Sequence, residues 1–340
     1  MVISLIQNKD FVYYNLHAEQ TISSTFFDGD IGIRVTELFS EALLRIEDNL
    51  NLINKINEKT VYLDFNKIDN AYKNLNKNLS KISKKCKLLI LLNLRDDVYS
   101  QLDIDLISGN THNLRNVQNN GYIMFYFEKK SNKENYIDEN DLFESSFRDF
   151  IIRFTDDNNS GYHQSSSVYL TKYIDIKKMI STEKAFFIYS IYQLALKIQN
   201  KWLNEIIDNN YQFPTLICQN LNSSFIASIL SSFLKLDVII LDHLGPINTM
   251  YSSLNKKIEE SKNYIIVSDV VCLGTEVKIA KNLINFLGGK VFGNISIVKI
   301  ETLNNDDIQI EEKKLKTISV FNVNKDNNEG IDFEIKTALK

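Results

Sequence analysis

The stretch YIIVSDVVCLGTEVKIAKNL, Tyr264 to Leu283, decides the fold of the second half of the chain. The apolar run Tyr264–Val267 is followed by a polar segment with one glycine, Ser268–Thr275, and then by apolar residues at helical spacing. We predict a buried strand that ends at Val267, a loop over Ser268–Thr275, and a helix behind it. In α/β sheets, ligands bind at the carboxyl ends of the strands, where loops and helix N-termini supply N–H groups.

The residues of this loop suit a phosphate. The strand delivers Asp269 to the rim of the sheet, Gly274 allows a tight turn around an anion, and Thr275 offers a hydroxyl and an amide at the positive end of a helix. A phosphate fits there, with the Asp269 carboxylate reaching neighbouring sugar hydroxyls. In the structural interpretation, Asp269 only caps the helix and Gly274 only serves a turn.

Short apolar strands alternate with helices on both sides of this stretch. Strands are predicted at TLIC (215–218), VIIL (238–241) and VFGNISIVKI (291–300), and helices at SSFIASILSSFL (223–234) and VKIAKNLINFLGG (277–289). Continuous apolar strands separated by helices are typical of parallel sheets covered on both faces. The second half is therefore predicted to be a doubly wound α/β domain.

The first half is predicted to be a smaller α/β domain. VISLIQNKDFVYYNL (2–16) reads as a hairpin, Ile33–Leu50 as an amphipathic helix, and Thr60–Phe65, Leu88–Leu92 and Gly121–Phe127 as strands. A long polar segment, Glu128–Ser160, follows, and we place the domain boundary in it. The predicted domains are residues 1–150 for regulation or interaction, 151–325 for the ligand-binding domain, and 326–340 for a C-terminal tail.

Composition narrows the function. The chain has 340 residues, 44% hydrophobic and 24% charged, which is a globular composition, and a net charge of −4, which gives no strong nucleic-acid signal. No apolar run reaches the roughly 20 residues that span a bilayer, and the start lacks a secretory pattern, so we expect no membrane association and a cytoplasmic location. Cys86, Cys218 and Cys272 lie far apart, and no metal is expected to be held directly by side chains.

The order of strand, acidic residue, Gly–Thr loop and helix resembles the signature of the type I phosphoribosyltransferases, and of orotate phosphoribosyltransferases in particular. The resemblance implies that this loop holds the 5′-phosphate of phosphoribosyl pyrophosphate (PRPP), that the acid contacts the ribose, and that Asp269 is needed for turnover. Ser268 replaces a first acid of the signature and Cys272 a threonine. The implied PRPP- or phosphate-binding residues are Ser268, Asp269, Cys272, Leu273, Gly274 and Thr275.

A second segment resembles the same family. SSSVYLTKYIDIKKMI, Ser165 to Ile180, is similar to the N-terminal hood of orotate phosphoribosyltransferases, which implies base recognition by Lys172 and Tyr173. In the alternative interpretation this is an ordinary strand, with Asp175 capping a turn. The resemblance covers residues 161–323, about half of the chain.

The chain also departs from the family pattern. The segment after the first core strand, Gln219–Ser224, has no glycine, and only Asn222 and Ser223 remain as candidates for pyrophosphate contact. Asp242 and His243 stand where the family has a basic pair; they form a possible acid/base pair, although adjacent strand residues point in opposite directions. Lys256 and Lys257 could supply cations only if their loop folds back.

The first half resembles STAS-like domains, small α/β modules of regulation and partner binding. Its strand pair, amphipathic helix, TVYLDF strand, second helix and LLILL strand follow that order. The resemblance implies a protein partner for this domain. Asp64, at the end of TVYLDF, is read as a structural strand-end acid.

Three functions stay open. The first is a divergent sensor or regulatory component that binds PRPP or a nucleoside phosphate. The resemblance suggests bacterial regulatory and defence operons as the setting of such a protein. The second is an active phosphoribosyltransferase acting on a nucleobase, with Mg²⁺ bound together with PRPP. The third is an interaction scaffold with a vestigial pocket. The family resemblance further implies a homodimer.

Overall fold

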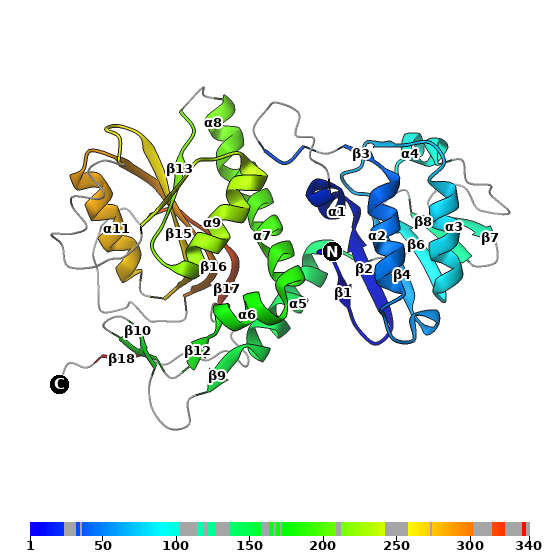
Figure 1. Ribbon diagram of the computed structural model, residues 1–340, viewed down its shortest axis with the longest axis horizontal. Coiled ribbons are helices and arrows are strands. Elements are labelled where there is room, and N and C mark those ends of the chain that lie inside the picture. Colours follow the sequence, from blue (N-terminus) through cyan, green and yellow to red (C-terminus); the bar gives the residue numbers. More distant parts are fainter. Residues whose placement is uncertain are drawn as a thin grey trace. The chain divides into compact units, whose positions relative to one another are not determined.

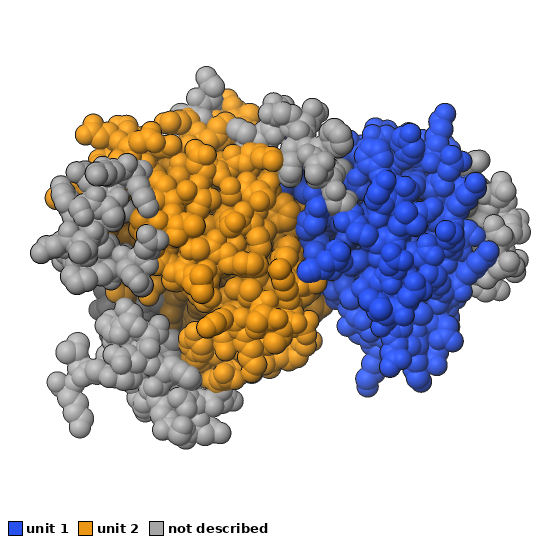
Figure 2. Space-filling view, viewed as in Figure 1, with its two compact units in different colours: residues 1–143 blue, residues 144–340 orange. Residues whose placement is uncertain are grey.

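The computed structural model describes residues 1–23, 32–34, 36–102, 114–118, 122–126, 137–157, 163–165, 168–170, 172–208, 212–241, 258–272, 274–301, 315–323 and 335–337. The chain forms two compact units, Met1–Phe143 and Glu144–Lys340, coloured blue and orange in Figure 2. Each unit has its own central sheet (Figure 1). Among the described residues, no helix has the length and apolar character needed to cross a membrane.

Unit 1 contains a six-stranded sheet in the order β1-β2-β4-β6-β8-β7. Its four central strands, β2, β4, β6 and β8, are parallel, and β1 and β7 pair antiparallel at the two edges. The strands are β1 (Ile6–Gln7), β2 (Phe11–Asn15), β4 (Thr60–Asp64), β6 (Leu88–Leu92), β7 (Leu114–Gln118) and β8 (Tyr122–Tyr126), and β3 (Glu37–Leu38) pairs separately with β5 (Asn70–Ala71). The helices are α1 (Leu16–Ser23), α2 (Ser40–Leu50), the 3₁₀ turn η1 (Ile56–Glu58), α3 (Asn76–Lys85) and α4 (Asp96–Gln101).

The predicted hairpin is confirmed. β1 and β2 pair antiparallel around a turn in which the Asn8 side-chain oxygen accepts hydrogen bonds from the N–H groups of Asp10 and Phe11, both at 2.8 Å. Asparagine suits this position because its side chain can bond to the backbone two and three residues further on. The predicted helix over Ile33–Leu50 is too long, because α2 begins at Ser40 and β3 precedes it.

The core of unit 1 lies between the sheet and α2. Leu43 and Ile46, one helical turn apart, are fully buried and belong to the same apolar cluster as Leu63 of β4 and Leu91 of β6. This spacing places one apolar stripe of α2 against alternate residues of the strands. The predicted amphipathic face therefore corresponds to the buried face of the helix.

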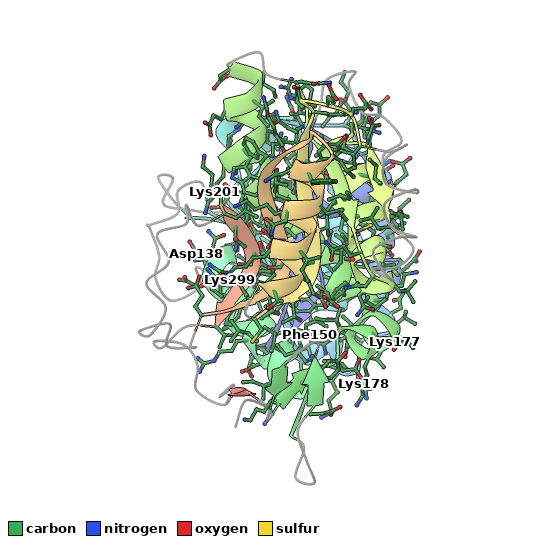
Figure 3. The ribbon with its side chains drawn as sticks, turned by 90° about the vertical axis from the view of Figure 1, so that its left-hand side faces the viewer. Asp138, Phe150, Lys177, Lys178, Lys201 and Lys299 are labelled. Carbon is green, nitrogen blue, oxygen red and sulfur yellow. The ribbon has the colours of Figure 1, made fainter. Side chains whose placement is uncertain are left out.

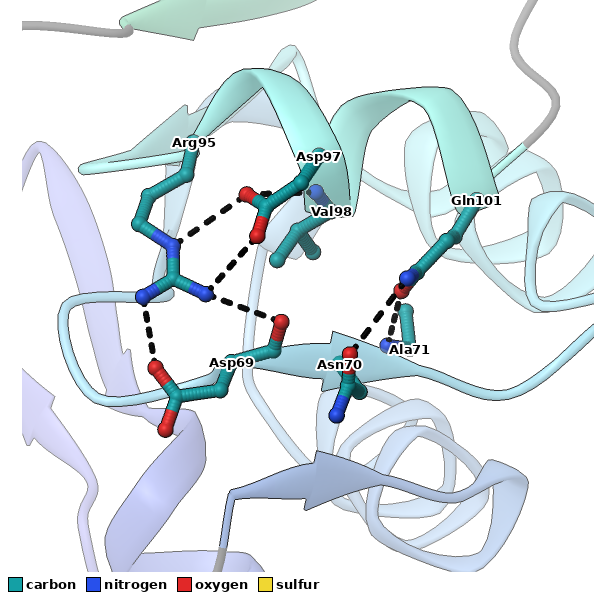
Figure 4. Close-up of polar contacts among 7 residues, drawn as sticks. All are labelled: Asp69, Asn70, Ala71, Arg95, Asp97, Val98 and Gln101. Atoms are coloured by element: carbon teal, nitrogen blue, oxygen red, sulfur yellow. Dashed lines mark hydrogen bonds and ion pairs between the residues drawn. The ribbon is translucent and has the colours of Figure 1, made fainter.

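A polar network fixes α4 to the segment around β5 (Figure 4). The Arg95 guanidinium donates from Nη1 to Asp69 Oδ1 at 2.6 Å and from Nη2 to Asp97 Oδ2 at 3.0 Å. At the other end of the helix, Gln101 Oε1 accepts the N–H of Ala71 at 2.6 Å. Because Nε and Nη2 also donate to the two oxygens of Asp97, a lysine ammonium would lose this bidentate contact.

Unit 2 contains a five-stranded, fully parallel sheet in the order β14-β13-β15-β16-β17. Its strands are β13 (Thr215–Cys218), β14 (Val238–Ile240), β15 (Asn263–Val271), β16 (Lys290–Ile300) and β17 (Thr317–Val323). The helices of this part are α5 (Glu139–Arg153), which begins in unit 1, α6 (Ile176–Thr182), α7 (Lys184–Ile198), the π-helical turn η2 (Gln199–Leu203), α8 (Asn204–Asp208), α9 (Leu221–Leu234) and α11 (Thr275–Phe286). Small peripheral strands complete it: β9 (Thr155–Asp157) pairs with β12 (Lys172–Ile174), and β11 (Val168–Leu170) lies between β10 (His163–Ser165) and β18 (Ile335–Thr337).

Helices cover both faces of this sheet (Figure 1). Val277 and Ala280 of α11 share an apolar cluster with Ile217 and Ile266, which lie on one face. On the other face, the Cys218 thiol lies 3.5 Å from the hydroxyl of Ser224 on α9. The α/β prediction with a doubly wound parallel sheet is therefore confirmed.

Candidate functional site

The strand order places a switch point between β13 and β15. The chain leaves β13 in one direction, through α9 to β14, and continues on the other side of β13 with β15. At such a point the connections diverge, and a crevice opens beyond the carboxyl ends of the two strands. The predicted phosphate loop follows β15, and the predicted pyrophosphate segment follows β13, so both lie at this switch point.

β15 is longer than predicted. It continues past Val267 to Val271, because β16 supplies pairing partners for Ser268, Val270 and Val271. The connection to α11 is therefore shorter than the predicted loop over Ser268–Thr275. Leu273, one of the predicted phosphate-binding residues, lies outside the described residues.

Gly274 has the backbone conformation that only glycine adopts readily. Its φ is +68°, and it is the last residue before α11 begins at Thr275. A Cβ added to Gly274 would have no atom within 4 Å, so the space beside this backbone is open. Open space at the amino end of a 12-residue helix is suited to an anion.

Hydrogen bonds hold both oxygens of the Asp269 carboxylate. Oδ1 accepts the N–H of Val270 at 2.9 Å, and Oδ2 accepts the side-chain amide of Asn222 at 2.8 Å. Asn222 lies in the first turn of α9, so this bond joins the ends of β13 and β15 across the switch point. Two residues that are 47 positions apart in sequence are thereby brought into one site.

The segment after β13 is a helix start, where the sequence indicated a loop over Gln219–Ser224. α9 begins at Leu221, with Asn220 as its N-cap, and Asn220 and Ser223 form a capping box. The Ser223 N–H donates to Asn220 Oδ1 at 2.8 Å, while Ser223 Oγ accepts the Asn220 N–H at 3.1 Å. Ser223 is fully buried, so its hydroxyl serves the helix, in contrast to the predicted pyrophosphate contact.

Tyr173 lies within electrostatic reach of Asp269. Burial raises the pKa of the Tyr173 hydroxyl, and the charges of Asp269 and Asp175 raise it further, although 39% of the residue is exposed. Asp175 caps α6 by accepting the N–H of Lys178 at 2.8 Å; Lys177 and Lys178 are labelled on this helix in Figure 3. The capping role considered for Asp175 is thus observed, and Tyr173 still borders the site.

Ser268 faces away from Asp269. Adjacent strand residues point to opposite faces, and Ser268 Oγ accepts a hydrogen bond at 3.1 Å from the amide of Asn294, which is 1% exposed. The same Asn294 amide donates to the carbonyl of Ile266 at 3.0 Å. Ser268 therefore joins a buried polar contact under the site.

Sequence reasoning missed Glu276. Desolvation raises the pKa of its carboxyl, and the negative charge of Asp269 raises it further, although the residue as a whole is exposed. Glu276 directly follows the Gly–Thr pair in the first turn of α11, and that adjacency was the available signal. Its carboxylate adds negative charge to the side of the site where the phosphate is expected.

The Cys272 thiol is not activated. Burial raises the pKa of this thiol to about 11. At neutral pH the side chain is therefore a protonated thiol.

Two further predicted features lie outside the described residues. Asp242 and His243, the possible acid/base pair, and Lys256 and Lys257, the possible cations, all belong to residues 242–257. In the described part of the chain, no group of three or more His, Cys, Asp or Glu side chains is arranged to hold a metal.

A cavity of about 530 Å³ lies at the opposite end of the strands. Thr215 begins β13, Asp237 precedes β14, and Lys262 precedes β15, so the cavity opens at the amino ends of the strands. There the Lys262 ammonium forms an ion pair with Glu259, with 3.1 Å between Nζ and Oε1. This cavity is therefore distinct from the switch point.

Unit 1 contains a second strand-end acid in a polar cluster. Asp64, at the end of β4, is 2% exposed and accepts hydrogen bonds from Asn93 Nδ2 at 2.8 Å, the Asn66 N–H at 2.8 Å and the Tyr13 hydroxyl at 2.9 Å. Burial, followed by the negative charge of Glu139, raises the Asp64 pKa to about 6. Both carboxylate oxygens of Asp64 therefore accept hydrogen bonds from other residues of unit 1, which agrees with the structural interpretation.

Several solved structures are similar to part of this chain. No protein-family model matches it, and comparison with curated proteins finds no match. It is similar to adenine phosphoribosyltransferase from Thermoanaerobacter pseudethanolicus (15% identity, TM-score 0.36, 51% of this chain and 98% of that one) and to orotate phosphoribosyltransferase from Aeropyrum pernix (14%, 0.38, 54% and 96%). A third is the orotate phosphoribosyltransferase of Mycobacterium tuberculosis in complex with inorganic phosphate (14%, 0.34, 53% and 96%). Each of these similarities covers about half of this chain.

Proposed function

We propose that unit 2 binds the ribose and 5′-phosphate of PRPP or a nucleoside phosphate, and that the protein acts as a sensor or regulatory component. One observation carries this proposal. At the switch point of the sheet, Asp269 is held in place by Val270 and Asn222, beside the open backbone at Gly274 and the start of α11.

Each part of this arrangement has a role in binding. The N–H groups at Gly274 and Thr275, at the positive end of α11, would receive the phosphate. The carboxylate of Asp269 has lone pairs beyond the two that its hydrogen bonds occupy, and these would accept ribose hydroxyls. Tyr173, at the border of the site, would contact the base.

Binding is favoured over transfer because of charge. Transfer from PRPP requires stabilisation of the departing pyrophosphate, which positively charged side chains normally supply. In the described part of the chain, no lysine or arginine forms an ion pair with Asp269, and the neighbouring acid is Glu276. Mg²⁺, proposed only together with PRPP, would take most of its oxygen ligands from that molecule and from water.

The test is a thermal-shift assay of the full chain with PRPP, ribose 5-phosphate and a panel of nucleoside 5′-monophosphates, with and without Mg²⁺. A ligand that binds the folded state raises the melting temperature. We expect stabilisation by at least one ribose phosphate. The Asp269→Asn variant should weaken binding roughly tenfold or more, because a hydrogen bond to a charged group is lost.

The matched control is Asp237→Asn, an exposed acid before β14 at the opposite end of the sheet. It should leave binding unchanged. If every ribose phosphate leaves the melting temperature unchanged, the proposed function is wrong and the scaffold hypothesis gains support. If Asp269→Asn responds as the unmodified protein does, the ligand binds elsewhere.

A further inference from the structure

The helix α3 of unit 1 presents a row of lysines to solvent. Leu79 and Ile82 face the apolar core, while Lys77, Lys81 and Lys84 lie on the opposite side of the helix, where all three are exposed. Positions i, i+4 and i+7 share one helical face, so the three side chains follow one line over about 10 Å of the helix. We call these three residues the lysine row.

No acidic side chain balances the lysine row. The sequence between Asp69 and Asp96 contains six lysines, one arginine and no acid. Lys85, next to the row, forms an ion pair at 3.0 Å with Glu47 of α2, the helix that lies beside α3 (Figure 1). Among the residues that the structure describes, no ion pair or hydrogen bond engages the three ammonium groups of the row. The row is therefore a local concentration of positive charge on a chain with a net charge of −4.

The stability of α3 does not account for this arrangement. The helix dipole favours cations in the last turn, which suits Lys84 and Lys85, but it disfavours Lys77 in the first turn. Lys77 and Lys81 are also four residues apart, and like charges at this spacing destabilise a helix. Local rules are broken in this way where a surface serves a function.

An exposed aromatic ring precedes the lysine row. Tyr72 is 56% exposed, and its ring packs against that of Phe39, with 5.6 Å between the ring centroids. Five residues of chain connect Tyr72 to Lys77, so their Cα atoms are at most about 18 Å apart. Single-stranded nucleic acids bind to surfaces that combine a line of cations with aromatic rings on which bases stack. An acidic protein surface would use the lysines alone.

We propose that the lysine row and Tyr72 bind a single-stranded nucleic acid, with backbone phosphates at the lysines and a base stacked on the Tyr72 ring. The phosphates of one strand supply a line of negative charge that is complementary to the row. This surface belongs wholly to unit 1, and the inference goes beyond the function proposed for unit 2. Because RNA and DNA share the phosphate backbone, the experiment uses both.

The experiment measures fluorescence anisotropy of labelled single strands of RNA and DNA, titrated with the full chain at several salt concentrations. Each phosphate that a protein neutralises on a single strand contributes about −0.7 to the slope of log K against log salt, so three lysines predict a slope of about −2. We expect this slope for at least one of the two strands, and the tighter one identifies the source. Absence of binding by both strands, or equally tight binding of a duplex of the same length, overturns the inference.

Removing the charges of the row tests the location of the site. The triple variant is Lys77→Gln, Lys81→Gln and Lys84→Gln. It should bind the strand roughly tenfold more weakly or worse at low salt, with a slope close to zero. Its melting temperature should not fall, because like charges have been removed from the helix. The matched control replaces three exposed lysines that lie elsewhere in the chain: Lys9→Gln, Lys55→Gln and Lys290→Gln. The control should leave the Kd unchanged.

The stacking contact has a different signature. Tyr72→Ala should weaken binding roughly fivefold or more and leave the salt slope unchanged, because stacking releases no counterions. A polyglutamate peptide serves as the probe for an acidic protein partner, and we expect it to bind more weakly than the strand. A peptide that binds as tightly as the strand overturns the inference in favour of a protein partner. Unchanged strand affinity in the folded triple variant overturns it as well, because the strand then binds elsewhere.

Discussion

At the scale of single residues, the environment of each acid or thiol determines its chemistry more than its type does. Asp269 is half-buried, with its carboxylate held by Val270 and Asn222, whereas Asp64 is enclosed by Tyr13, Asn66 and Asn93. Both acids lie at the ends of parallel strands. In the sequence, only the Gly–Thr pair that follows Asp269 distinguishes it from Asp64 as the candidate for ligand binding.

Asp64 should make unit 1 sensitive to pH. Its pKa is about 6 in the folded protein against an ordinary value of 3.8, so the folded state holds the proton more tightly between these values. The contribution of Asp64 to the free energy of unfolding is therefore fully present below about pH 4 and is lost as the pH rises through 6. At about 1.4 kcal/mol per pKa unit, the loss is about 3 kcal/mol.

The Asp64→Asn variant should remove that pH dependence. Its side-chain oxygen can still accept from Asn93 and Asn66, and its amide can donate to the Tyr13 hydroxyl. Urea denaturation of both proteins from pH 4 to pH 7, followed by circular dichroism, measures the difference. Stability curves that stay parallel over this range would show that Asp64 is not the group responsible.

Cys272 should react slowly at neutral pH. Because its thiol pKa is about 11, its rate of alkylation by iodoacetamide should keep rising well above pH 9, whereas the rate of free cysteine levels off near its ordinary pKa of about 8.5. Peptide mass spectrometry after timed labelling measures the rate at this residue. Labelling at pH 7 as fast as that of free cysteine would contradict the buried, protonated thiol.

At the scale of elements, sequence succeeded where an apolar run decides the structure. β6 matches its predicted range, Leu88–Leu92, and β13 matches Thr215–Cys218. Prediction from sequence failed where a distant strand or a helix cap determines where an element begins or ends. The last four residues of β15 are in the strand because β16 pairs with three of them, Ser268, Val270 and Val271, and no local pattern shows that. The start of α9 had a readable signal, because Asn220 and Ser223 have the spacing of a capping box.

Two glycines of unit 2 should respond differently to the same substitution. A Cβ at Gly274 has open space, so Gly274→Ala should cost about 1–2 kcal/mol, from the positive φ alone. A Cβ at Gly293 of β16 would lie 2.5 Å from the Trp202 ring and 2.9 Å from the Lys316 carbonyl, so Gly293→Ala should cost about 3 kcal/mol or more.

The fluorescence of Trp202, the single tryptophan of the chain, reports urea unfolding of unit 2 for both variants. Gly274→Ala should also weaken phosphate binding, because it narrows the open space at α11. Equal destabilisation by the two substitutions would contradict the contacts assigned to Gly293.

At the scale of the whole molecule, sequence indicated two α/β parts, and the structure has two compact units. The division falls between Phe143 and Glu144, inside α5 and inside the polar segment Glu128–Ser160. Sequence presented Asn222 and Asp269 as separate candidates. Only the strand order, with β13 beside β15, brings them together.

The regulatory role and protein partner of unit 1, the homodimer and the cytoplasmic location stay predictions. Light scattering of the purified chain, with and without a nucleoside monophosphate, measures its oligomeric state.

The most direct test of the central claim is a crystal structure of the full chain with a nucleoside 5′-monophosphate. Our account predicts the phosphate at the N–H groups of Gly274 and Thr275, with a ribose hydroxyl within hydrogen-bond distance of Asp269. A nucleotide bound at the amino ends of the strands, in the cavity of about 530 Å³ beside Thr215 and Lys262, would contradict it.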